Sequence, residues 1–268
     1  MDRSEKFANP PIVELVLGVQ FSPLTKLTAG HFGLFWKGLG DDWNEPSDGP
    51  IIEDQFEWFD RPKRSAAKEL QLRFEPMRFP GRFLVAHKQQ DRLIQMQATR
   101  FHLNWRKRPG GVYLSYGSLI AEFEETFAKF AAFVEKAHLG SVVVNQWELT
   151  YIDAFPEGEY WQTPADWAKV LPGFFSDLFS TNEIGTKLEH RAAEWSYEIE
   201  PKRGRLHVVA QAGRAGDDTR EALLLQMTAR GPGTNETVRA GFDLGHKAAL
   251  RTFLKVVSEE TLRKWRLA

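Results

Sequence analysis

The segment Ile-Val-Glu-Leu-Val-Leu-Gly-Val-Gln-Phe, residues 12–21, sets the fold class of this chain. Its odd positions from Val13 to Phe21 are all apolar, whereas Glu14 and Gln20 stand at even positions. Apolar residues at every second position, several of them β-branched, predict a β-strand that buries one face.

A second copy of this pattern occurs in the other half of the chain. Residues 147–149 and 155 match residues 13–15 and 21 at a constant offset of 134 positions. The shared order of elements around the two strands is the stronger argument, because short matches arise by chance.

The first predicted strand is followed by a helix over 28–39 and a long acidic-then-basic connection. That connection could carry one strand at 51–58. Apolar periodicity and turn residues then predict three strands, at 70–75, 82–89 and 92–107, and a helix over 119–138 with Ser118 as its cap. The parity of the last strand changes near Thr99, which predicts a β-bulge. The second copy has a strand over 147–155, a helix over 164–171, strands at 190–199, 205–211 and 221–229, and a closing helix over 244–265.

These elements predict an α+β fold with an internal duplication of strand, helix, three strands and helix. The expected sheet is largely antiparallel and carries its helices on one face. The repeats would span residues 1–139 and 140–268 as one integrated pseudo-symmetric unit, because only Leu139-Gly140-Ser141 separates them.

Composition excludes several classes of protein. The 268 residues include 42% hydrophobic and 26% charged residues, the mixture typical of globular domains. Lys and Arg number 35 against 36 Asp and Glu, which argues against a large nucleic-acid footprint. The absence of cysteine excludes disulfides and thiolate metal sites. No apolar leader or stretch of about 20 apolar residues is present, so a cytoplasmic, non-membrane protein is expected.

Three motifs carry a resemblance to a known group of sequences. They are Phe7-Ala8-Asn9-Pro10-Pro11-Ile12-Val13-Glu14, the central Asn104-Trp105-Arg106-Lys107, and a final helix with His246 and Trp265. Together they resemble a sporadically distributed family of uncharacterised bacterial proteins. The resemblance implies a similar fold and carries no established activity.

The strand around residue 104 suggests a candidate binding strip. Its polar side chains fall on one face: Arg100, His102, Asn104, Arg106 and Arg108. Arginine forks suit phosphate or carboxylate oxygens, so the strip could bind an anion or a nucleic-acid backbone. The ordinary alternative is a solvated sheet face with local ion pairs.

Glu14 and Glu148 form a second candidate. They occupy equivalent positions of the two matching strands, on the face opposite the apolar set. The pseudo-symmetry predicts that the two carboxylates approach one another in a shared groove, where they could act as acid and base or hold a divalent ion. The alternative is that each pairs with a basic residue on a neighbouring strand.

No nucleotide-binding, metal-ligand or nucleophile motif occurs, so we expect no cofactor, no metal and no assigned catalytic residue. Aromatic residues in irregular segments, among them Phe56 and Trp58, suit protein interfaces. The leading prediction is therefore a non-enzymatic interaction or regulatory protein that binds a macromolecular partner, most simply a protein, through its loops and exposed sheet face. A module for a phosphate-bearing ligand or nucleic acid comes second and a hydrolase using the two glutamates third. The partner, the process and the oligomeric state stay open.

Overall fold

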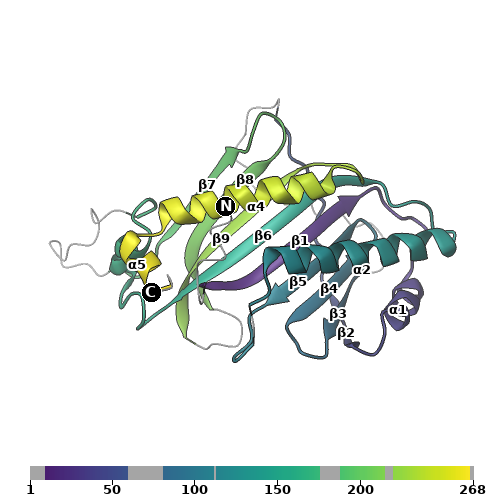
Figure 1. Cartoon of the computed structure of the whole chain (residues 1–268), viewed down its shortest axis with the longest axis horizontal. Coiled ribbons are helices and arrows are strands. Elements are labelled where there is room, and N and C mark those ends of the chain that lie inside the picture. Colours follow the sequence, from purple (N-terminus) through teal and green to yellow (C-terminus); the bar gives the residue numbers. More distant parts are fainter. Residues whose placement is uncertain (1–9, 60–80, 112, 176–187, 215–219, 266–268) are drawn as a thin grey trace.

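A computed structural model describes residues 10–59, 81–111, 113–175, 188–214 and 220–265. Their strands form one nine-stranded sheet in the order β2-β3-β4-β5-β1-β6-β9-β8-β7, and every neighbouring pair with a described register is antiparallel. Helices cover one face of the sheet (Figure 1). The α+β class and the antiparallel sheet are thereby confirmed, whereas the internal duplication stays a prediction.

The strands at the centre of the sheet are the two on which the sequence argument rests. Their bounds and those of their neighbours are β1 Ile12–Phe21, β2 Trp43–Gly49, β3 Arg82–His87, β4 Arg92–Gln97, β5 Arg100–Arg106, β6 Val144–Pro156, β7 Ala192–Glu198, β8 Arg205–Arg214 and β9 Glu221–Pro232. β1 has the predicted bounds, and it pairs with β6 with Val16 opposite Thr150.

The helices differ from the prediction mainly at their ends. They are α1 Ala29–Gly38, α2 Tyr116–Lys136, α3 Trp167–Val170 after the short turn η2 Pro164–Asp166, α4 Val238–Val256 and α5 Glu259–Arg263. Ser115, not Ser118, caps α2, because its hydroxyl oxygen accepts a hydrogen bond from the Ser118 amide at 3.2 Å. The predicted closing helix is interrupted, since Ser258 caps a separate α5.

The predicted β-bulge near Thr99 is wrong. Ala98 and Thr99 instead form a two-residue turn between β4 and β5, which pair from Gln97 opposite Arg100 onward. The Thr99 carbonyl accepts a hydrogen bond from the amide of Phe21, the last residue of β1, and the Ala98 carbonyl accepts one from the amide of Leu24. Both are 2.9 Å long. A chain reversal restarts the alternation of side chains, and so it changes the parity as a bulge would.

The predicted strand over 51–58 is also wrong. The strand in this region is β2, over residues 43–49, which pairs with β3 at the edge of the sheet. Pro46 lies within it, and an edge strand tolerates proline because one row of its backbone groups has no strand partner. The strand predicted at 70–75 lies outside the described residues.

The apolar core fills the space between the sheet and its helices. Leu15, Leu17 and Val19 of β1 are fully buried. On the neighbouring β5 the ring of Phe101 packs against Phe130 of α2, with centroids 5.3 Å apart. Since these buried apolar residues alternate along β1 with polar residues such as Glu14 and Gln20, the polar side chains lie on the opposite face.

Candidate functional site

The polar face of the sheet carries a chain of hydrogen bonds that crosses four strands. Arg82 of β3 donates to Gln95 of β4 at 2.9 Å, and the Gln95 amide donates to Asn104 of β5 at 2.6 Å. Asn104 in turn donates to Oε1 of Glu14 on β1 at 2.6 Å. One residue from each strand therefore contributes to a continuous polar row.

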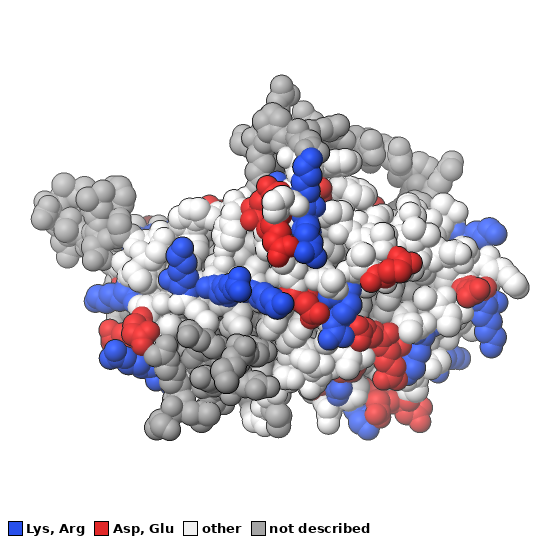
Figure 2. Space-filling view, turned by 45° about the horizontal axis from the view of Figure 1, so that its top comes forward, with Lys and Arg blue, Asp and Glu red and all other residues white. Residues whose placement is uncertain are grey.

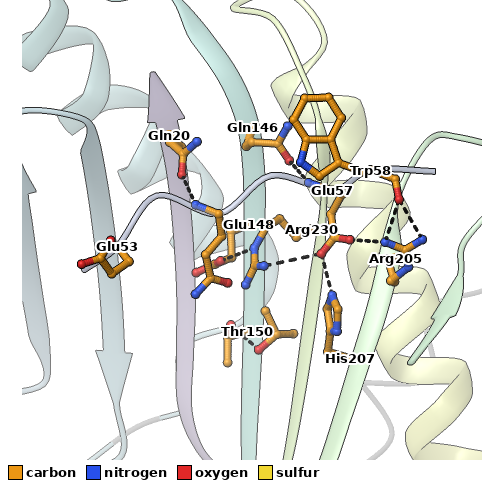
Figure 3. Close-up of polar contacts among 12 residues, drawn as sticks. Gln20, Glu53, Glu57, Trp58, Gln146, Glu148, Thr150, Arg205, His207 and Arg230 are labelled. Carbon is orange, nitrogen blue, oxygen red and sulfur yellow. Dashed lines mark hydrogen bonds and ion pairs between the residues drawn. The ribbon is translucent and has the colours of Figure 1, made fainter. Parts of the chain in front are cut away.

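A second polar cluster lies on the other half of the same face (Figure 3). Arg230 of β9 donates through Nε to Oε2 of Glu148 on β6 at 2.6 Å, and its Nη1 lies 3.5 Å from Oε1 of Glu57. Glu57 also forms ion pairs with Arg205 and His207 of β8, and its Oε1 lies 2.6 Å from Nε2 of His207. Glu57 belongs to no strand, so this cluster ties a connecting segment to the sheet.

That segment, residues 51–59, is called the strap below because it runs across the strands over the polar face (Figure 3). Glutamine side chains of the sheet accept hydrogen bonds from its backbone. The Ile52 amide donates to Gln97 at 3.1 Å, and the Gln97 side chain donates back to the Ile52 carbonyl at 2.8 Å. The strap is thus held by its main chain on side chains of the sheet, and it adds no strand.

The same arrangement continues along the strap. The backbone amide of Gln55 donates to Oε1 of Gln20 at 2.9 Å, and that of Glu57 donates to Oε1 of Gln146 at 3.3 Å. Gln20 of β1 and Gln146 of β6 are direct partners in the sheet register. Three glutamines therefore anchor the strap at residues 52, 55 and 57.

The predicted arginine strip is only partly a surface. Arg100, His102 and Asn104 are 3%, 4% and 6% exposed, so the alternative of a solvated sheet face is wrong at these positions. Arg100 donates to Gln20 at 2.8 Å and to the carbonyl of Glu53 at 2.6 Å. The strap and the neighbouring side chains take the place of solvent here.

Burial also changes the protonation of this region. It lowers the pKa of His102 to about 4, and the positive charge of Arg100 acts in the same direction. The His102 ring is therefore neutral at pH 7. Its ring atom Cδ2 would lie 2.0 Å from a Cβ added to Gly18, so this glycine makes room for the ring.

Glu14 and Glu148 lie on the same face, as expected, but the expected contact between them is not found. The register sets Glu14 opposite Ile152 and Glu148 opposite Gly18, which separates the two glutamates by four positions, about 13 Å along the strands. Burial acts to raise the pKa of Glu148, but the charges of Arg230 and Arg100 outweigh it and the pKa is lowered. Each glutamate pairs with a neighbouring strand and not with the other.

Arg106 and Arg108 lie away from the strap, in an open groove of about 850 Å³. The groove also holds Lys107, Arg220 and Lys264, so five cationic side chains face two carboxylates, those of Glu14 and Glu159. Arg108 donates to the carbonyl of Gln90 at 2.6 Å, which fixes its guanidinium at the groove wall. The structure thereby splits the predicted strip into a buried part and a groove part.

Several residues of this face were not singled out from the sequence. They are Gln20, Glu57, Gln97, Gln146, Arg205, His207 and Arg230. Those on strands stand at the polar positions of an alternating pattern, and this alternation could have identified them in the sequence. No pattern could have identified Glu57, because it belongs to a connecting segment without periodicity.

Within the described ranges, no three His, Asp or Glu side chains gather closely enough to hold a metal ion. The helices among those ranges are also too short or too polar to cross a membrane. Comparison with models of known families finds no match, and comparison with curated proteins finds none either. The resemblance to a bacterial family stays a prediction.

Proposed function

We propose that this protein is a non-enzymatic interaction module whose polar sheet face binds an extended acidic segment of a partner protein. The observation that carries the proposal is the strap, a segment of the chain itself that lies on this face in an extended form. A partner segment of similar chemistry would exchange with the strap and take over its contacts.

Recognition of the main chain supports this proposal. Gln20, Gln97 and Gln146 bind backbone groups of the strap, and Gln97 both accepts and donates at Ile52. Backbone contacts of this kind select an extended conformation whatever the side chains, as in peptide recognition by an added strand. Phe56 and Trp58 of the strap are 44% and 60% exposed, so these backbone contacts do not specify which side chains a bound segment carries at the same positions.

Charge supports an acidic occupant. The strap contributes Glu57, which is 9% exposed, to a site made of Arg205, His207 and Arg230. Arg100 lies 3.7 Å from a second strap carboxylate, Asp54. Arginine forks with buried carboxylates give specificity, because an unpaired charge in the same place would be costly.

The test uses a strap that is weakened in the full-length chain. Gln55→Pro removes one anchoring amide and Glu57→Ala removes the buried carboxylate, while the sheet face stays unchanged. A synthetic peptide with the sequence of residues 51–59 should bind this double variant at least tenfold more tightly than the unaltered protein. The tethered strap competes at a high effective concentration in the unaltered protein.

A matched peptide with Gln at the position of Glu57 is the control, and it should bind at least tenfold more weakly than the acidic peptide. Circular dichroism checks that the double variant folds, and Glu57→Ala alone serves if it does not. Equal binding of both peptides, or no binding by a folded variant, would show that the strap is only a structural element.

A second candidate function rests on the groove around Arg106 and Lys264. Its excess of cationic side chains suits a phosphate-bearing ligand. A large nucleic-acid footprint has less support, because 35 Lys and Arg are balanced by 36 Asp and Glu, and basic and acidic side chains also lie beside one another on the helix-bearing side seen in Figure 2. The groove therefore favours a small anion as the alternative ligand.

We also infer that the two halves arose by duplication. Strands β5, β4 and β3 follow β1 outward on one side, and β9, β8 and β7 follow β6 on the other. Val16 pairs with Thr150, and these residues are also equivalent at the sequence offset of 134, as a two-fold axis between them would require. β2 has no counterpart, so the first half has four described strands after β1 where three were expected.

A further inference from the structure

A small pocket lies between the sheet and α4, on the face opposite the strap. Its volume is about 40 Å³, room for two or three water-sized groups. The walls are mostly apolar and come from the segment entering β1, from β6 and β9 and from α4, and they include Pro10, Ile12, Met227, Leu250 and Phe253. The pocket shares no residue with the strap site, so an inference here is independent of the proposed function.

Asp153 is the unusual residue in this wall. It is 1% exposed, and among the described residues no group donates a hydrogen bond to its Oδ1. It stands at an odd position of β6, in line with Leu149, Tyr151 and Phe155, so its side chain points to the core side of the sheet. A carboxyl group in this setting costs free energy unless something pairs with it.

The part of the pocket wall around His246 is held by several contacts. His246 of α4 has its Nδ1 atom 2.7 Å from the hydroxyl of Tyr151, and the ring of Tyr116 stacks on it with centroids 4.1 Å apart. Tyr116 is fixed in turn by donating to Asp243 at 2.7 Å. The titratable groups that line the pocket beside Asp153 are Tyr113, Tyr151 and His246, and no Lys or Arg of the described residues lines it.

We propose that this pocket binds the ammonium group of a small primary amine, with Asp153 as its counter-ion. One carboxylate matches one positive charge, and a wall that includes the aromatic residues Tyr151 and Phe253 suits a cation with an apolar stem. A divalent metal would need several oxygen ligands, and Asp153 supplies the only carboxylate of the described wall. The volume restricts the buried part of the ligand to its ammonium end.

The protonation of Asp153 gives the proposal a signature. Burial raises the pKa of Asp153 to about 8, so the carboxyl is mostly neutral at pH 7 in the empty pocket. Binding of an ammonium group needs the ionised form, and it therefore releases a proton. The apparent affinity scales with the fraction of protein in which Asp153 is ionised, so it should rise roughly 25-fold between pH 6.5 and 8.5.

The experiment titrates the full chain with propylammonium and follows the carboxyl carbon of Asp153 by NMR, with n-propanol as the neutral probe of equal length. Propylammonium should bind with the stated pH dependence and n-propanol should not. Asp153→Asn should lower the affinity for propylammonium at least tenfold. Asp42→Asn, which changes an exposed aspartate, should leave the affinity unchanged. Binding that survives in Asp153→Asn, equal binding of n-propanol, or no binding of propylammonium at pH 8.5 would each overturn the proposal.

Discussion

The Nε2 atom of His207 lies 2.6 Å from Oε1 of Glu57, although 150 positions of sequence separate the two residues. This contact joins a connecting segment of the first half to a strand of the second half. Arg205 binds the other oxygen of the same carboxylate. A carboxylate on a loop thereby becomes the centre of a buried charge cluster on the sheet.

We expect Glu57→Gln to lower the free energy of unfolding by about 2 kcal/mol at pH 7, because hydrogen bonds to charged groups contribute about 1.5–3 kcal/mol each. Burial acts to raise the pKa of Glu57, but His207 and Arg205 outweigh it and the pKa lies below its usual value of 4.5. The contribution is therefore present above about pH 4.5 and is lost as the pH falls further. Urea denaturation from pH 3 to 8 measures it.

Glu53→Gln is the matched control in the same strap. Its side chain is exposed, and its carbonyl, which accepts from Arg100, stays in place. The control should unfold like the unaltered protein at every pH. If both variants lose equal stability, the charge cluster has no special part in holding the strap.

Asp153→Asn should stabilise the protein at alkaline pH. The pKa of Asp153 is raised by burial from an ordinary 3.8 to about 8, so the unaltered protein loses stability as the pH rises from about 4 to about 8 and then levels off. The neutral isostere removes this slope, and the gain at pH 8.5 should be about 1–3 kcal/mol. Thermal unfolding at pH 5, 7 and 8.5 tests this, and parallel pH profiles for the two proteins would contradict it.

Gly241→Ala should destabilise the contact between α4 and β6. A Cβ atom at this position would lie 2.4 Å from Cδ1 of Trp147, a buried indole that cannot move aside. Overpacking of this kind costs about 1–3 kcal/mol. Gly33→Ala on α1 is the control, since no atom lies within 4 Å of the added Cβ, and alanine should stabilise that helix by up to about 1 kcal/mol. Equal unfolding midpoints for the two variants would mean that α4 packs differently.

Arg106→Ala with Lys264→Ala should weaken the binding of inorganic pyrophosphate at least tenfold. Both side chains line the groove, and each lost charged hydrogen bond costs about 1.5–3 kcal/mol. Lys37→Ala with Lys129→Ala removes the same charge from exposed helix positions and should leave binding unchanged. Calorimetric titration distinguishes the pairs, and similar losses in both would indicate a general charge effect without a site.

The local sequence pattern was enough to predict those strands and helices that bury one face and leave the other face polar. The alternation in residues 12–21 predicted β1 with its true bounds, and the apolar stripe of Phe123, Phe127 and Phe130 predicted α2. The period of the side chains is fixed by the backbone geometry, so one buried face leaves a visible trace. For the same reason Arg100, His102 and Asn104 were placed on one face before any contact was known.

Sequence alone determined that this chain has an α+β fold with an antiparallel sheet. It also determined that one face of the sheet is apolar and that polar residues are grouped on the other face. Tertiary structure alone decided that a turn at Ala98 and Thr99 reverses the chain, that the strap covers Arg100, and that Asp153 lies in an apolar pocket. The reason is physical. Periodicity reports whether a side chain faces water or protein within one element, whereas the partner of a buried polar group comes from a distant part of the chain.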